Sequence, residues 1–376
     1  LSTVLHCSQR STKIMELCEK RLVPNESPTA ACHASTINRK KNGEILTAWF
    51  GGSKEGADDV GIYFSRKRES GDFQAAEKIA GGEEPHWNPV LFSEDDRKIL
   101  LFYKKGRLIS KWRTYIRISM DGGETFGEER ELVPGETGGR GPVRNKPLWL
   151  SNGRILCPAS VEGDVWKAFT DISEDGGKTF VRSNWIEICK RTTLNMHFGN
   201  KINKSDCECN IKVYDKDSEK YESKSHYESD IPVSDQSFHG RGVIQPTLWA
   251  DDENHIHMLL RSTEGKIYRS DSADGGYHWS PAVPTDIPNN NSGIDITKLS
   301  DGRLILVHNP VGKNWGARSP LSISVSEDNG KTFERLYDLE KGPGEFSYPA
   351  IVSQQNEIYV TYTYDRKNIV FCHIKL

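Results

Sequence analysis

The feature that most constrains the fold of this chain is a short motif that recurs at a nearly fixed spacing. The pattern Ser-x-Asp-x-Gly-x-x-aromatic begins at Ser119, Ser173, Ser272 and Ser326, so that the copies lie 54, 99 and 54 residues apart. A degraded copy begins at Ser65, 54 residues before the first. Asp and Gly favour a tight turn, through side-chain hydrogen bonds to the backbone and a positive φ, and the aromatic residue can pack between strands. The motif therefore predicts one structural unit about every 54 residues.

The sequence between the motifs predicts short strands, because apolar residues alternate or form brief runs bounded by turn residues. Short strands in units of this length are typical of propeller blades of four strands each. We expect an all-β chain, a single six-bladed β-propeller domain over 1–376, with its blades near 33–80, 86–133, 143–188, 240–287, 292–340 and 345–376. The last unit has room for about three strands, so residues 12–23 are expected to complete it. Segment 190–238 is interpreted as an insertion, and a seven-bladed ring would require that segment to form a blade.

Composition excludes several classes of partner. The chain has 50 Lys and Arg against 53 Asp and Glu, a formal net charge of −3, and no long run of one sign, which argues against nucleic-acid binding. No apolar stretch approaches the roughly 20 residues of a membrane-spanning helix, so no membrane partner is expected. The eight cysteines lack the paired spacing of a zinc site, and neither a metal nor an organic cofactor is expected. Two glycosylation sequons, at Asn203 and Asn290, favour a secreted or periplasmic location, and the oligomeric state is left open.

Together with residues near the motifs, the repeats resemble the sialidase-like superfamily of BNR repeats over nearly the whole chain outside the insertion. In sialidases three arginines bind the sugar carboxylate, a tyrosine assisted by a glutamate attacks the anomeric carbon, and an aspartate is the acid/base. The resemblance implies that Arg261 and Arg318 are two of the arginines and that Tyr348, in Ser347-Tyr348-Pro349, is the nucleophile. A neutral nucleophile suits a carbon that carries a carboxylate, since it avoids charge repulsion.

The chain departs from the sialidase pattern at two positions. His33 stands where the first arginine is expected, and Gln245 stands where the activating glutamate is expected. An amide cannot accept the phenolic proton as a carboxylate does. The acid/base is assigned to Asp58 or Asp59, because the alignment fits either. His33 is either a proton-transfer group or a hydrogen-bonded core residue.

Further contacts to substrate are expected from the residues that open the second and third blades, because the innermost strands line the centre of a propeller. These residues are His86, Trp87, Asn145 and Lys146. Trp87 is expected to stack on a sugar face. The motif aspartates Asp121, Asp175, Asp274 and Asp328 are expected to be structural, without a catalytic role.

The leading functional hypothesis is an exo-glycosidase, a hydrolase whose substrate and partner is an acidic, carboxylate-bearing glycan. One alternative is a uronate-directed polysaccharide lyase, in which arginine neutralises the carboxylate, His33 removes the C5 proton and Tyr348 protonates the leaving group. Another is a glycan-binding propeller without catalysis. Mass detection of the products distinguishes addition of water from elimination and from binding alone.

Overall fold

The computed structural model describes residues 15–24, 26–69, 71–93, 95–189 and 240–376. This part of the chain is built from β-strands, and its one helical element is a single 3₁₀ turn, Ile109–Lys111. The all-β prediction is therefore confirmed. The expected insertion at 190–238 lies outside the described residues, as does any seventh blade formed by it. In the described part, no helix is long and apolar enough to cross a membrane.

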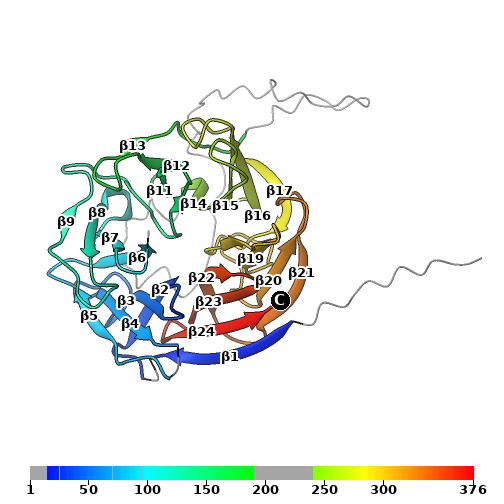
Figure 1. Ribbon diagram of the computed structural model, residues 1–376. Coiled ribbons are helices and arrows are strands. Elements are labelled where there is room, and N and C mark those ends of the chain that lie inside the picture. Colours follow the sequence, from blue (N-terminus) through cyan, green and yellow to red (C-terminus); the bar gives the residue numbers. More distant parts are fainter. Residues whose placement is uncertain (1–14, 25, 70, 94, 190–239) are drawn as a thin grey trace, which may run out of the picture.

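The strands pair in antiparallel groups of four, which Figure 1 shows side by side around a common axis. The first two groups are β2 (Ala31–Arg39), β3 (Ile45–Gly52), β4 (Gly61–Lys67) and β5 (Glu77–Ala80), then β6 (His86–Ser93), β7 (Ile99–Lys105), β8 (Arg113–Ser119) and β9 (Arg130–Glu131). The third and fourth are β10 (Leu148–Trp149), β11 (Ile155–Val161), β12 (Val165–Ser173) and β13 (Val181–Arg182), then β14 (Arg241–Ala250), β15 (Ile256–Ser262), β16 (Lys266–Ser272) and β17 (Val283–Pro288). A short parallel pairing of β12 with β14 joins the third group to the fourth.

The fifth and sixth groups complete the described strands. They are β18 (Asp295–Lys298), β19 (Leu304–His308), β20 (Leu321–Ser326) and β21 (Glu334–Glu340), then β22 (Phe346–Gln354), β23 (Glu357–Tyr364), β24 (Asn368–Lys375) and β1 (Glu16–Val23). The N-terminal strand β1 pairs antiparallel with the C-terminal strand β24 along its whole length. The first and last of the described strands thus share one sheet.

The four motif copies all occupy the turn between the third and fourth strands of a group. In the copy that follows β12, the Ser173 hydroxyl donates to Asp175 Oδ1 at 2.8 Å and accepts from the Gly177 N–H at 2.8 Å. Asp175 Oδ1 also accepts from the Thr179 N–H at 2.9 Å, and Gly177 has a φ of 87°. These contacts all lie within a few residues, which is why a local sequence pattern is sufficient to specify the turn.

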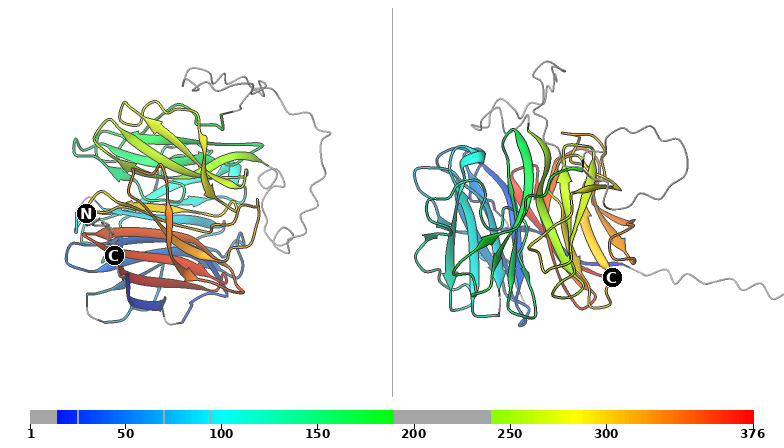
Figure 2. Two further views of the ribbon diagram at one scale, coloured as in Figure 1. Left: turned by 90° about the vertical axis from the view of Figure 1, so that its right-hand side faces the viewer. Right: turned by 90° about the horizontal axis from the view of Figure 1, so that it is seen from above.

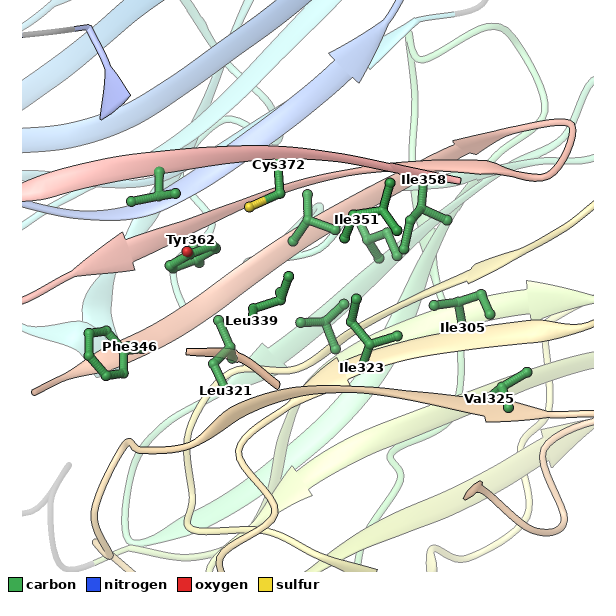
Figure 3. Packing of buried hydrophobic residues seen from close by; sticks show 14 of the residues in the cluster. Ile305, Leu321, Ile323, Val325, Leu339, Phe346, Ile351, Ile358, Tyr362 and Cys372 are labelled. Atoms are coloured by element: carbon green, nitrogen blue, oxygen red, sulfur yellow. The ribbon is translucent and has the colours of Figure 1, made fainter. Parts of the chain in front are cut away.

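The hydrophobic core lies between neighbouring groups. Figure 3 shows the cluster between the fifth and sixth groups, in which Ile305 and Ile323 pack with Ile351 and Ile358, all fully buried. Each such side chain contributes about 1.5–3 kcal/mol through removal from water. Because both sheets contribute to one cluster, no group buries its apolar faces alone.

The fold also fixes where a site can form. In the side views of Figure 2 the strands run between two opposite faces of the ring. The first strands lie close to one another, with β2 in contact with β6 and β22, and β18 in contact with β14 and β22. Because the strands within a group are antiparallel, the start of the first strand and the end of the second strand lie at the same face. Side chains at these positions in different groups can therefore meet.

Candidate functional site

The first strand of four groups carries the same backbone irregularity near its start. The pairing with the second strand shifts register at this point, where one residue without the freedom of glycine has a positive φ. These residues are Ala34 (54°), Asn88 (40°), Gln245 (51°) and Tyr348 (53°). A left-handed conformation at such residues costs on the order of 1–3 kcal/mol and is concentrated at functional sites. Two of the four, Gln245 and Tyr348, are predicted site residues.

Arg261 joins these two residues. Its side chain comes from the end of β15 and is 2% exposed. Nη1 donates to Tyr348 Oη at 2.6 Å and to Gln245 Oε1 at 3.0 Å, while Nε donates to Asn291 Oδ1 at 2.9 Å. A guanidinium that donates to a phenol oxygen stabilises negative charge on that oxygen.

A second guanidinium, that of Arg318, also adjoins the phenol. Its Cζ lies 5.3 Å from the centre of the Tyr348 ring. Nη1 of Arg318 contacts Glu345 Oε1 at 2.8 Å, and the same carboxylate oxygen accepts from Nε of Arg366 at 2.8 Å. Arg366 also pairs with Glu55, which follows β3. The structure thus brings Arg261, Arg318 and Tyr348 together, and adds a guanidinium that the sequence analysis did not identify.

His33 packs directly on Tyr348. The two ring centres are 4.2 Å apart, and His33 is 3% exposed. Within the described residues, neither ring nitrogen has a hydrogen-bond partner. Burial lowers the pKa of His33 well below its usual value, and the positive charges of Arg366, Arg318 and two further arginines lower it more. This shift favours the neutral imidazole at neutral pH, and the hydrogen bonds of a core histidine, the alternative interpretation, are not found among the described residues.

Arg144 lies beneath the tyrosine and is almost fully buried, at 1% exposed. Nη2 donates to the backbone carbonyl oxygens of Tyr348 and Pro349, the latter at 2.9 Å, and Cζ lies 5.3 Å from the centre of the Tyr348 ring. Burial lowers the pKa of Arg144 to about 10. This arginine holds the backbone at the position where Tyr348 has its positive φ.

The adjacent residues of the third group support other parts of the site. Nδ2 of Asn145 donates to the backbone carbonyl oxygens of Gln245 and Pro246, at 3.2 and 2.9 Å. Lys146 Nζ contacts both carboxylate oxygens of Asp295 at 3.0 Å. The structure therefore places Asn145 and Lys146 behind the site, in contact with its backbone and with a buried carboxylate.

The two acid/base candidates lie on the loop between β3 and β4, and both are exposed. Asp58 forms an ion pair with Arg107 at 2.9 Å, and Asp59 accepts from the backbone N–H and the hydroxyl of Ser53, each at 2.9 Å. Neither carboxylate bonds to the arginines around Tyr348 among the described residues. The same loop carries Glu55, whose ion pair with Arg366 ties it to the site.

The residues that open the second group are buried. Trp87 is 2% exposed, packs against Phe50 and Trp112, and donates from its indole N–H to the Gly106 carbonyl oxygen at 2.8 Å. This placement in an aromatic core differs from the expected stacking on a sugar. His86 stacks on Tyr103 and is 1% exposed, and burial lowers its pKa.

A buried carboxylate, Glu162, was also missed by the sequence analysis. It follows β11, and its Oε1 accepts from Gln245 Nε2 at 3.3 Å. Burial raises the pKa of Glu162. No short motif surrounds Glu162 or Arg366, so the sequence carries little local signal for them, whereas Arg144 belongs to the same segment as the predicted Asn145 and Lys146. In contrast, the residue with the positive φ precedes a proline in three of the four first strands with a register shift, at Pro89, Pro246 and Pro349.

The described residues contain no cluster of three or more His, Cys, Asp or Glu side chains suited to a metal ion. The guanidiniums suit a carboxylate ligand, because planar donor pairs match its geometry.

Comparison with known proteins identifies a family for most of the chain. The sequence profile of the family described as BNR repeat-like domain matches residues 43–360, which is most of the chain. No curated protein sequence matches this chain significantly.

Three solved structures illustrate the similarity of fold. A protein of unknown function from Dyadobacter fermentans is 14% identical, with a TM-score of 0.68, over 96% of this chain and 99% of that one. Trypanosoma rangeli sialidase in complex with the inhibitor DANA is 12% identical, with a TM-score of 0.63, over 94% of this chain. NanB sialidase from Streptococcus pneumoniae is also 12% identical, with a TM-score of 0.63, over 94% of this chain. The matches span 57% of the trypanosomal chain and 70% of the streptococcal one, and at these identities they show the fold alone.

Proposed function

This chain belongs to the BNR repeat-like family, and from that premise we propose that it is an exo-glycosidase that hydrolyses a terminal, carboxylate-bearing sugar. One observation carries the proposal. The phenol of Tyr348 lies between two guanidiniums, with Arg261 Nη1 2.6 Å from its oxygen and Arg318 Cζ 5.3 Å from its ring centre. Fold alone does not establish activity, so the argument rests on this site.

The first step is recognition of the carboxylate. Arg318 is the more exposed of the two predicted arginines and shares the Glu345 carboxylate with Arg366. In the proposed complex a sugar carboxylate interacts with this pair of guanidiniums, which places the anomeric carbon near Tyr348. Recognition by paired, charged donors makes the site selective for acidic over neutral sugars.

The second step is attack by the phenol oxygen of Tyr348 on the anomeric carbon, while the phenolic proton passes to the neutral imidazole of His33, which lies against the tyrosine. The bond to the leaving oxygen breaks, and that oxygen takes a proton from Asp58 or Asp59. Water then attacks the anomeric carbon, gives its proton to the same aspartate and releases Tyr348, whose oxygen takes back its proton from His33. Arg261 stabilises charge on the phenol oxygen in both halves of the reaction, which is the kind of electrostatic contribution worth about 10²–10³ in rate.

A specific observation favours a second candidate function, a uronate lyase. His33 is neutral, lies against Tyr348, and has no hydrogen-bond partner on either ring nitrogen among the described residues. A neutral imidazole can remove the proton at C5 while the electron pair forms the C4–C5 double bond. The C4–O bond breaks as this double bond forms, and Tyr348 gives its proton to the leaving oxygen.

The test is a screen of the purified protein against acidic oligosaccharides, with mass detection of the products. Hydrolysis adds the mass of water, whereas elimination yields an unsaturated uronide without added water. For the substrate that is turned over, Arg318→Met is expected to lower kcat/KM by about 10²-fold or more. The matched control is Arg335→Met, since Arg335 is half exposed on β21 and forms a local ion pair with Asp338. Equal activity of the two variants contradicts the proposed site, and binding without any product supports the non-catalytic alternative.

A further inference from the structure

One buried carboxylate has no part in the mechanism above. Glu162 is 9% exposed and lies at the end of β11, in the third group. Its hydrogen bond is to the side chain of Gln245, from the fourth group, at 3.3 Å. Within the described part of the chain it forms no salt bridge, although it lies in the field of the Arg261 charge. Burial of a carboxylate without an ion-pair partner costs free energy, so its presence at this position needs an explanation.

The hydrogen bond decides which way the Gln245 amide points. An ionised carboxylate only accepts hydrogen bonds and a guanidinium only donates them, whereas an amide has one end of each kind. With its NH₂ toward Glu162, Gln245 presents its oxygen to Arg261 Nη1, 3.0 Å away. A flipped amide would place two donors together at Arg261 and two acceptors together at Glu162. The carboxylate and the guanidinium therefore favour the same orientation.

The same guanidinium nitrogen continues the chain of contacts to the phenol. Arg261 Nη1 contacts both Gln245 Oε1 and Tyr348 Oη, the latter at 2.6 Å. The backbone supports this arrangement, since Asn145 anchors the carbonyl of Gln245 and Arg144 anchors that of Tyr348. Gln245 carries no negative charge. The carboxylate of Glu162 supplies one, and it lies one hydrogen bond farther from the phenol than the side chain of Gln245 does.

We propose that Glu162 is a positioning residue of this site, which acts on Tyr348 through the amide of Gln245 and the guanidinium of Arg261. Its catalytic consequence rests on the proposed function, whereas its structural consequence does not. Removal of the acceptor frees the Gln245 amide to rotate, so that Arg261 is no longer held against the tyrosine.

The structural consequence is tested without any substrate. Protein labelled with ¹⁵N-glutamine is used to record side-chain amide resonances, and Gln245→Leu identifies the Gln245 pair. We expect this pair to shift when Glu162 titrates, and to shift or broaden in Glu162→Leu. Glu334→Leu, an exposed change on β21, is the control and should leave it in place. If the Gln245 side-chain amide resonances change neither with pH nor in Glu162→Leu, the proposal is overturned.

The catalytic consequence is tested on whichever acidic oligosaccharide the screen identifies. Glu162→Leu is expected to lower kcat about 10–100-fold with little change in KM, because alignment of the reacting group rather than substrate binding is lost. Glu162→Gln, whose carbonyl can still accept the hydrogen bond, should recover most of that loss. The double variant Glu162→Leu/Gln245→Leu should be no slower than Gln245→Leu alone, since the two residues act in one chain.

The outcomes separate the two proposals. Additive losses in the double variant, or equal losses for Glu162→Gln and Glu162→Leu, overturn the positioning role. Absence of any turnover in the wild type removes the proposed function, while the resonance experiment still decides the role of Glu162. If Glu162→Leu does not fold, the pH titration of the wild type and the Glu162→Gln variant provide the decision.

Discussion

Replacement of Asp295 by leucine tests whether one buried carboxylate holds neighbouring groups of the ring together. Asp295 opens β18, is 1% exposed, and contacts Lys146 Nζ of the third group at 3.0 Å with both oxygens. It also accepts from the hydroxyl of Thr247 at 2.6 Å and from the backbone N–H of Ile351 at 2.9 Å, in the fourth and sixth groups. One side chain of the fifth group thus contacts the third, fourth and sixth groups.

The expected loss follows from these contacts. Removal of one partner of a buried ion pair costs about 3–5 kcal/mol, and a buried N–H left without an acceptor costs about 1–3 kcal/mol. Because Lys146 is partly exposed and can reach water, we take about 4 kcal/mol as the net loss. For a chain of this size, about 4 kcal/mol corresponds to a fall in Tm of about 5 °C.

The assay is thermal unfolding followed by circular dichroism at fixed protein concentration. The control is Asp286→Leu, because Asp286 is fully exposed on β17, and a surface change of this kind alters stability by about 0.5 kcal/mol or less. Lys146→Met combined with Asp295→Leu should cost less than the sum of the two single changes. A melting curve of Asp295→Leu within about 1 °C of the wild type would refute the reasoning.

Two further predictions concern pH. The pKa of His33 is lowered on folding, so the unfolded chain takes up a proton first as the pH falls below about 6.5. The wild type should therefore lose stability relative to His33→Phe between about pH 6.5 and 5. A stability difference independent of pH contradicts the assignment of a neutral, buried imidazole. The pKa of Glu162 is raised on folding, so the folded chain keeps the carboxyl proton to a higher pH than the unfolded chain does. The wild type should therefore lose stability relative to Glu162→Gln as the pH rises above about 4.3. Denaturant titrations at several pH values measure the stability differences for both His33 and Glu162. A stability advantage of Glu162→Gln that shrinks with rising pH contradicts the prediction for Glu162.

Some features of the site were accessible from the sequence because they are tied to a recognisable pattern. Arg261, Arg318 and Tyr348 were predicted from their places relative to the repeated motif and to short neighbouring sequences such as Ser347-Tyr348-Pro349. The structure brings these three side chains together. Their roles in catalysis stay predictions, as do those of Asp58 and Asp59.

Other features depended on packing that no local pattern records. The sequence around Trp87 is compatible both with a side chain that stacks on a sugar and with a buried one. The contacts of Trp87 with Phe50 and Trp112 show that it is buried. Likewise, Arg144 contacts the backbone of Tyr348 across 204 residues of sequence. Contacts at such separations are set by how the groups are arranged around the axis.

By itself the sequence determined the repeating strand-turn unit, because the hydrogen bonds of each motif turn join residues at most four positions apart. It also determined the all-β class, since a turn of this kind joins adjacent antiparallel strands. The tertiary structure decided the chemistry around Tyr348. The charges of Arg144 and Glu162 come from the third group and that of Arg366 from the sixth, and the field at one phenol depends on distance in space rather than on separation along the chain.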